Sequence, residues 1–136
     1  MKKLNLILVY NQDEDKILMC QRAKEPFKGK FNLVGGKVEQ DEEELHAAYR
    51  ELQEETGAID FKIEPICVYS VKGKTRVNEN IDDETFGMLF IADISSFVEL
   101  HCEIEKILIS DKLVDNWTYP LIQPILIEEA KKRGFI

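Results

Sequence analysis

The chain has 136 residues, of which 44% are hydrophobic and 32% are charged, and its formal net charge is −8. This length predicts a single domain over residues 1–136 with a core of its own, and the composition excludes a disordered chain. The acidic balance argues against general nucleic-acid or membrane binding, because both partners attract basic proteins. A polyphosphate remains a compatible partner if metal ions or a few basic groups bridge the repulsion.

The N-terminal half predicts a hairpin followed by a loop. Two β-rich runs, 4–10 and 16–22, flank a polar turn. A loop rich in Pro, Gly and Lys follows at 23–30, and then a short apolar run at 31–34 leads into two glycines. The first apolar run follows two lysines, as the apolar region of a signal peptide would, but the run is short and lacks a small-residue cleavage site. We therefore predict that this run forms a strand and is not a signal peptide.

The C-terminal half predicts further strands and a closing helix. Strand-like runs at 59–73 and 84–94 flank a polar segment, 74–83, that we expect to be a mobile loop, and 103–110 is a possible further strand. Apolar residues at helical spacing and a basic last turn predict a helix over 121–134. The pattern as a whole predicts one mixed sheet with helices packed against it, an α/β fold.

The cysteines and the hydropathy bear on the cellular compartment. Cys20, Cys67 and Cys102 are widely spaced and form no C-x-x-C pair, which favours free thiols in a reducing compartment over a disulfide framework or a zinc site. No run approaches the roughly 20 apolar residues of a membrane span. We therefore expect a cytoplasmic protein with no membrane partner, present as a monomer or a homodimer.

The segment between the glycines and Gly57 predicts an acidic helix. Asp41 is a plausible N-cap, with Glu44 completing a capping box, and Gly57 is a natural left-handed end. Helical geometry places four apolar residues within an arc of about 100° that we expect to be buried. These residues are Leu45, Ala48, Tyr49 and Leu52.

A second arc of this helix carries three carboxylates beside the expected buried face. They belong to Glu51, Glu54 and Glu55, and Ala47 projects among them and leaves room. Like charges in a partly desolvated place repel strongly, so a cation is the natural partner, and hard divalent cations prefer carboxylate oxygens. The alternative is a solvated acidic face, which is the usual fate of a charge run.

The spacing of these residues favours the cation. The segment follows the pattern glycine, five residues, glutamate, seven residues, then R-E-apolar-x-E-E-x-G-apolar, which is the Nudix box. The matching residues are Gly36, Glu42, Arg50, Glu51, Leu52, Glu54, Glu55, Gly57 and Ala58. The chain therefore resembles a Nudix hydrolase, over the box and, more loosely, over the order of elements from about Leu4 to Ser110. Val34 stands where proline is commoner in the family, a departure that touches loop rigidity more than chemistry.

The resemblance implies a Nudix fold, in which a mixed β-sheet is sandwiched between α-helices, and an enzyme. Nudix hydrolases cleave a nucleoside diphosphate linked to another group, with Mg²⁺ or Mn²⁺. By position, Glu51, Glu54 and Glu55 would be the metal ligands, assisted by the carbonyl of Gly36. Arg50 would hold the ligand shell. Glu42 would anchor the junction between loop and helix, and Gly35 would allow a tight turn.

Outside the box the resemblance implies further candidates. Arg22 matches a position where relatives place a phosphate-contacting arginine, although a plain surface arginine is the alternative. Lys37 is a weaker phosphate candidate. An additional glutamate often serves as ligand or general base in the family, and Glu103 is our candidate for it; Glu105 and Glu84 are the alternatives. The two histidines, His46 and His101, are expected at the surface.

The sequence leaves the substrate open. Asn116 could hydrogen-bond a purine edge, while Trp117 could instead close an edge of the core. Four aromatic residues could stack on a base, but such residues usually belong to a core. They are Phe27, Phe31, Tyr69 and Phe86.

Three functions remain possible. Two downstream marks that separate subfamilies of the family are missing from this sequence. No proline lies about 16 residues past the box, as it tends to in ADP-ribose hydrolases, and no S-Q-P-W-P-F stretch suggests cleavage of NADH. These absences favour, by default, a MutT-like nucleoside-triphosphate pyrophosphohydrolase, with oxidised purine nucleotides among its candidate substrates. The alternatives are an enzyme for ADP-ribose, nucleotide sugars or another diphosphate, and a catalytically silent nucleotide sensor, which the intact carboxylates disfavour.

Overall fold

The structure is a computed structural model that describes residues 2–11, 15–25, 27–57, 61–74, 82–93, 105–110, 114–118 and 122–136. Seven strands and two helices form in it. In chain order they are β1 (Lys2–Asn11), β2 (Lys16–Arg22), β3 (Phe31–Asn32), β4 (Val34–Lys37), α1 (Glu44–Thr56), β5 (Lys62–Lys74), β6 (Asp82–Asp93), β7 (Glu105–Ser110) and α2 (Gln123–Lys132).

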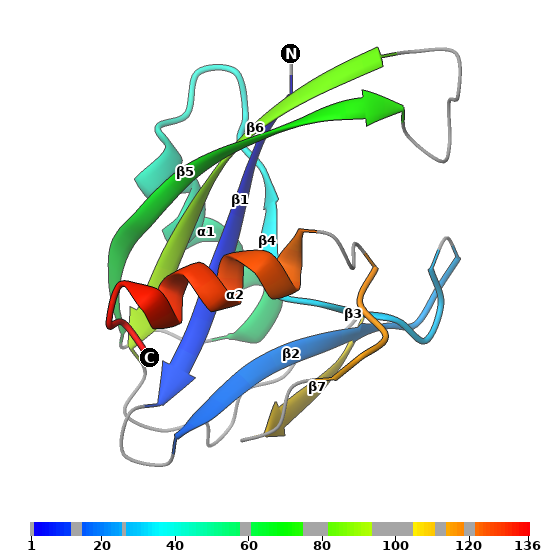
Figure 1. Ribbon diagram of the computed structural model, residues 1–136, viewed down its shortest axis with the longest axis vertical. Helices are drawn as coiled ribbons and strands as arrows, with labels where there is room; N and C mark the ends of the chain where they lie inside the picture. Colours follow the sequence, from blue (N-terminus) through cyan, green and yellow to red (C-terminus); the bar gives the residue numbers. More distant parts are fainter. Residues whose placement is uncertain are drawn as a thin grey trace.

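The strands form one mixed sheet. Its main path runs β3-β2-β1-β6-β5, with β4 paired to β1 and β7 paired to β2. β1 and β6 are parallel, whereas the other pairs are antiparallel. The two helices lie on opposite faces of this sheet (Figure 1). The predicted mixed sheet between helices is confirmed.

Alternation along β1 divides the core between the two faces. Ile7 and Val9 pack in one cluster with Leu52 of α1, and Leu8 packs in the other with Ile127 of α2. The side chains of Ile7, Leu8, Val9 and Leu52 are all fully buried. A strand buried on both faces reads as a continuous apolar run, which is why 4–10 shows almost no polar alternation.

Most of the expected elements form close to their expected bounds. The hairpin is confirmed, with Tyr10 opposite Ile17 and Asn11 opposite Lys16. The expected runs 59–73, 84–94 and 103–110 become β5, β6 and β7, and the closing helix is α2. The predicted loop 74–83 is shorter than expected, because β5 reaches Lys74 and β6 begins at Asp82; its other residues lie outside the described ones.

The start of α1 differs from the prediction. The helix begins at Glu44, and its N-cap is Glu43, which makes no side-chain capping bond. The capping box from Asp41 is therefore wrong. The chain is held in a turn for two more residues because Glu42 bonds to Glu39 through its backbone N–H and to Arg50 through its carboxylate. The left-handed end is confirmed, since Gly57 has φ 74°.

The buried face of α1 is also rotated from the prediction. Leu45 and Tyr49 are 44% and 39% exposed, so their expected burial is wrong. The residues that face inward are Ala47, Ala48, Glu51, Leu52 and Thr56. Two alanines let the helix approach the sheet closely, and the rotation carries a carboxylate inward with them. No helix among the described residues is long and apolar enough to span a membrane.

Candidate active site

The two glycines of β4 let the backbone approach its neighbours closely. β4 pairs with β1, with Gly36 opposite Asn5. A Cβ at Gly35 would collide with the carbonyl oxygen of Asn5. A Cβ at Gly36 would lie 3.4 Å from the carboxyl carbon of Glu51. The missing side chains therefore make room for the inward-facing carboxylate of α1 directly against β4.

Glu51 is the most unusual residue of this site. It is 3% exposed, and both carboxylate oxygens are buried without a hydrogen bond from any described residue. The nearest cation, the guanidinium of Arg50, has its Nη2 3.9 Å from Oε1. Burial raises the pKa of Glu51 to about 8, although Arg50 opposes this and nearby carboxylates add to it. An ionised carboxylate at this position needs a positive partner.

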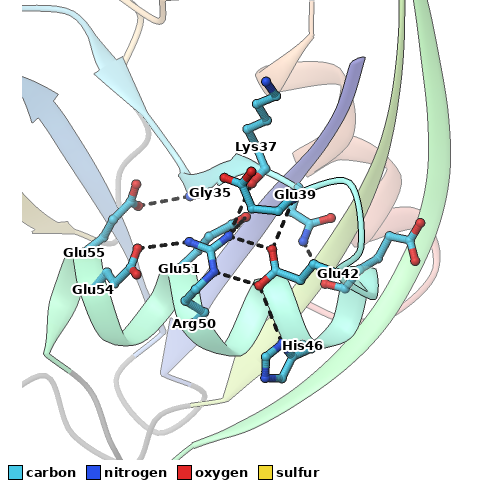
Figure 2. A network of polar contacts seen from close by, with 11 residues as sticks. Gly35, Lys37, Glu39, Glu42, His46, Arg50, Glu51, Glu54 and Glu55 are labelled. Atoms are coloured by element: carbon cyan, nitrogen blue, oxygen red, sulfur yellow. Dashed lines mark hydrogen bonds and ion pairs between the residues drawn. The ribbon is translucent and has the colours of Figure 1, made fainter. Parts of the chain in front are cut away.

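Arg50 ties the helix to the preceding turn. Its Nε and Nη2 each donate to the carboxylate of Glu42 at 2.8 Å, and Nη1 donates to Glu54 at 3.1 Å (Figure 2). Nη2 also reaches the carbonyl of Lys37 at 3.4 Å. The bonds from Arg50 lower the pKa of Glu42 to about 2, so this carboxylate is ionised at neutral pH. The ion pair between Arg50 and Glu42 therefore fixes the turn that connects the glycines of β4 to α1.

The three box carboxylates lie along one side of α1 and are not gathered at one point. The backbone N–H of Gly35 donates to Oε2 of Glu55 at 3.1 Å, Glu54 is directed to Arg50, and Glu51 lies against Gly36 (Figure 2). Within the described ranges, no group of three acidic, histidine or cysteine side chains is close enough to hold a metal ion. Joint ligation therefore requires rotation of Glu54 and Glu55.

The donor set nevertheless fits a hard divalent cation. It consists of carboxylate and backbone oxygens, which Mg²⁺ and Mn²⁺ prefer. The two unpartnered oxygens of Glu51 are the acceptors that such an ion would satisfy. Glu54 is 62% exposed and is held by a single surface ion pair, so its rotation has a small energetic cost.

The candidates for phosphate binding lie on two different strands. Arg22 ends β2, where its backbone bonds with Gly29 and Lys30 across the 23–30 loop. Lys37 ends β4, and its side chain is exposed and extends away from the carboxylates (Figure 2). Their proposed roles stay predictions.

The glutamate candidates outside the box are only partly described. Glu103 lies outside the described residues, as does His101. Glu105 begins β7 opposite Arg22, and Glu84 lies in β6, but their side chains are not described. His46 is exposed, as expected, 3.5 Å from Glu42.

The base-contact candidates divide between core and surface. Trp117 is 3% exposed, which agrees with a place at the core edge, and Phe31 and Tyr69 pack against the same cluster. Asn116 is exposed, and its amide nitrogen donates to the carbonyl of Gly29 at 3.2 Å. Phe27 is half-buried in the 23–30 loop, and the side chain of Phe86 is not described.

Several polar residues around the site escaped the sequence reasoning. Asn5 is 1% exposed, and its amide nitrogen donates to the carbonyl of Glu44 at 2.8 Å, which fastens the start of α1 to β1. A single asparagine within an apolar strand was the available signal for it. A second polar group consists of Asn32, Thr118 and Gln123, which are joined by hydrogen bonds. No local sequence pattern predicts this group, because Asn32 is far from the other two residues in the sequence.

Comparison with known proteins agrees with this geometry. The NUDIX domain family matches residues 3–112. ADP-ribose pyrophosphatase of Methanocaldococcus jannaschii is 44% identical over 59 residues, which are 43% of this chain and 35% of that protein. The 8-oxo-dGDP phosphatase NUDT18 of Mus musculus is 33% identical over 67 residues, 49% of this chain and 20% of that protein. The matched segments thus span 35% and 20% of the lengths of these relatives.

A solved structure supports the fold over nearly the whole chain. The MutT NUDIX hydrolase from Burkholderia pseudomallei superposes with a TM-score of 0.70 at 21% identity, and the match covers 94% of this chain and 96% of that one. At this identity the likeness concerns the fold alone. Because the family match covers most of the sequence, the expected relationship is confirmed: the chain belongs to the NUDIX domain family.

Proposed function

We propose that the chain is a divalent-metal-dependent hydrolase that cleaves a phosphoanhydride bond in a nucleoside diphosphate linked to another group. The observation that carries the proposal is Glu51, whose buried and unpartnered carboxylate lies against Gly36 beside two further carboxylates. A structural role alone does not account for an acidic group buried without a donor, because such burial destabilises the fold. Family membership supports the same chemistry.

In this proposal, Glu51, Glu54 and Glu55 hold Mg²⁺ or Mn²⁺ with the carbonyl of Gly36. The bound metal would screen the phosphate charges and lower the pKa of the attacking water. Arg50 fixes the turn that carries Gly36, through its two bonds to the carboxylate in that turn. Support of this kind orients ligands without contacting substrate.

The remaining residues of the proposal act on the substrate or on the water. Arg22 and Lys37 are the proposed phosphate contacts, because their cations would offset the repulsion between a polyphosphate and an acidic chain. Glu103 is the proposed general base, and Asn116 a proposed contact to the base.

The proposed substrate is a purine nucleoside triphosphate, cleaved to the monophosphate and pyrophosphate as in MutT-like enzymes. The name of the mouse relative, an 8-oxo-dGDP phosphatase, supports a nucleotide with an oxidised purine. A second candidate is ADP-ribose, favoured by the name of the archaeal relative.

A substrate panel with Mg²⁺ or Mn²⁺, with products identified by mass spectrometry, tests both candidates. In ¹⁸O-labelled water, attack at the β-phosphorus of a triphosphate would place the label in pyrophosphate, and label in the monophosphate would instead mean attack at the α-phosphorus. Release of ribose 5-phosphate from ADP-ribose at a much higher kcat/KM than any triphosphate would establish the second candidate. Undiminished hydrolysis after treatment with a chelator would refute metal dependence.

A further inference from the structure

Asn5 is a buried polar residue of β1 whose side chain faces α1. It is 1% exposed, and its Nδ2 donates to the backbone carbonyl of Glu44 at 2.8 Å. Its Oδ1 is buried and accepts no hydrogen bond from the described residues. An unpaired buried acceptor destabilises a fold, so the bond to Glu44 alone does not explain why an amide stands at this position.

A flip of the Asn5 amide does not remove this unpaired oxygen. Its hydrogen-bond partner is a backbone carbonyl, which can only accept. A flip would place Oδ1 where Nδ2 now lies, 2.8 Å from another acceptor, and would break that bond. Asn5 therefore presents an acceptor to the space on the far side of its amide from the Glu44 carbonyl.

Glu51 lies on the other side of that space. It follows Glu44 by seven residues, which places both on one face of α1, about 10.5 Å apart along the axis. Helix carbonyls point towards the C-terminus and helix side chains lean towards the N-terminus, so the Glu44 carbonyl and the Glu51 carboxylate converge. The residues between them on this face are Ala47 and Ala48, both 0% exposed, whose small side chains leave room.

The sheet places the same two side chains together. Asn5 lies directly opposite Gly36 in the antiparallel pair of β1 and β4, so their Cβ positions lie on one face of the sheet. Opposite Cβ positions are about 4.5–5.5 Å apart. Because a Cβ at Gly36 would lie 3.4 Å from the carboxyl carbon of Glu51, that carbon is within about 9 Å of the Cβ of Asn5.

The space between Asn5 and Glu51 holds acceptors only. Both carboxylate oxygens of Glu51 are buried and unpaired within the described residues, as is Oδ1 of Asn5. Mg²⁺ keeps several water molecules at about 2.1 Å, and each directs its hydrogens away from the cation. With about 2.8 Å more for a hydrogen bond, such a water reaches an acceptor roughly 5 Å from the cation. A hydrated cation at Glu51 therefore supplies the donor that Oδ1 of Asn5 lacks.

We propose that Asn5 is a positioning residue of the metal centre, whose Oδ1 accepts a hydrogen bond from a water molecule bound to the cation at Glu51. Partners of this kind orient what the cation holds without contacting the substrate. The bond from Nδ2 to the Glu44 carbonyl fixes the height of this acceptor along α1. The assignment rests on the proposed function only in placing a divalent cation at Glu51, and it requires neither a particular substrate nor hydrolysis.

Calorimetric titration of the substrate-free protein with Mg²⁺ and with Ca²⁺ tests the assignment. Asn5→Leu removes the acceptor and should weaken Mg²⁺ binding about tenfold or more. The loss for Ca²⁺ should be smaller, because Ca²⁺ accepts a flexible set of 6–8 oxygen ligands whereas Mg²⁺ demands near-octahedral geometry. Unchanged Mg²⁺ affinity would overturn the assignment. An equal loss for both cations would also overturn it, because it would show that only the fastening of α1 was lost.

Two further variants separate the acceptor from the fastening. Asn5→Asp loses the bond to the Glu44 carbonyl, as leucine does, but keeps an acceptor and should bind Mg²⁺ at least as tightly as the wild type. Asn11→Leu is the matched control, because Asn11 is also buried, at 2% exposure, and lies six residues away on the same strand. It should leave both affinities unchanged. An Asn5→Asp protein that binds Mg²⁺ as weakly as Asn5→Leu would exclude the acceptor role.

The wild-type chain gives a readout that does not depend on whether Asn5→Leu folds. The side-chain amide resonances of Asn5 are assigned in the ¹⁵N-labelled protein by their loss in Asn5→Asp. They should shift as Mg²⁺ is added, since a new hydrogen bond to Oδ1 polarises the amide. Resonances that stay in place at saturating Mg²⁺ would overturn the assignment.

The two proposals fail in different ways. A Mg²⁺ affinity that depends on Asn5, in a chain that hydrolyses no nucleotide, would leave the role of Asn5 standing and refute the hydrolase. Metal-dependent hydrolysis by a chain whose Mg²⁺ affinity does not respond to Asn5→Leu would do the reverse. A wild-type chain without affinity for Mg²⁺ would refute both.

Discussion

Replacing Glu51 by Gln should stabilise the chelator-treated protein at alkaline pH and abolish its stabilisation by Mg²⁺. The carboxyl is 3% exposed with no hydrogen bond to either oxygen from the described residues, and its pKa is raised from 4.5 to about 8. One pKa unit corresponds to about 1.4 kcal/mol. Ionised Glu51 therefore destabilises the fold by up to roughly 5 kcal/mol without a cation.

The buried amide of the variant offsets part of this gain. A glutamine there leaves polar atoms unpaired, which costs about 1–3 kcal/mol. The net stabilisation by Glu51→Gln should be about 2 kcal/mol or more above pH 8. For a domain of this size, that corresponds to an increase in Tm of roughly 5–10 °C.

The pH dependence has a definite direction. Since the pKa of Glu51 is higher in the folded chain than in the unfolded one, the folded state retains the proton between about pH 4.5 and pH 8. This contribution to wild-type stability is fully present below pH 4.5, is lost as the pH rises towards 8, and stays lost above it. The difference in Tm between Glu51→Gln and wild type should therefore grow from pH 5 to pH 8 and then level off.

Thermal unfolding in EDTA and in Mg²⁺, from pH 5 to pH 9, measures all of these effects. Mg²⁺ should raise the Tm of the wild-type chain and leave that of Glu51→Gln almost unchanged, because ligand binding stabilises only the state that binds. A difference in Tm between variant and wild type that does not change with pH would refute the buried-charge reasoning. An equal response of both proteins to Mg²⁺ would refute Glu51 as a ligand.

Three further substitutions test other parts of the site and fold. Glu54→Gln should remove most turnover while changing the free energy of unfolding by less than about 1 kcal/mol, because it removes only an exposed pair with Arg50; near-wild-type hydrolysis would refute its assignment as a ligand. Arg22→Ala should lower kcat/KM by an amount equivalent to about 1–3 kcal/mol if it contacts a phosphate, and unchanged kinetics with every good substrate would leave it a surface residue. Gly87→Ala should destabilise the fold by about 1–3 kcal/mol in urea unfolding, because its Cβ would collide with the ring of Tyr69; wild-type stability would show that the ring moves freely.

Local patterns were sufficient for the order of the elements. Residues 4–10 and 16–22 carry a β-rich pattern on either side of a polar turn, so their pairing required no distant contact. Gly57 ends α1 through its own left-handed backbone, a property of one residue. The spacing of Glu51, Glu54 and Glu55 likewise follows from helical geometry, so their common side of α1 was predictable.

Periodicity could not determine how α1 is rotated about its axis. The apolar pattern favoured Leu45 and Tyr49 as buried, yet both are exposed and Ala47 and Glu51 face inward. The glycines of β4 decide this, because the space above Gly36 accepts the carboxylate of Glu51. Such a space exists only after β4 has paired with β1.

The sequence by itself determined the chemistry available to this protein: an acidic helix behind two glycines, spaced as in a family of metal-dependent hydrolases. Tertiary structure alone decided which carboxylate is buried and which polar residues meet. Asn32, Thr118 and Gln123 are separated by up to 91 residues, and their hydrogen bonds form only because segment 114–118 joins β3 and α2 begins beside it. Helix and strand periodicity is a local property of the chain, whereas a contact between residues far apart in the sequence exists only after the fold has brought their segments together.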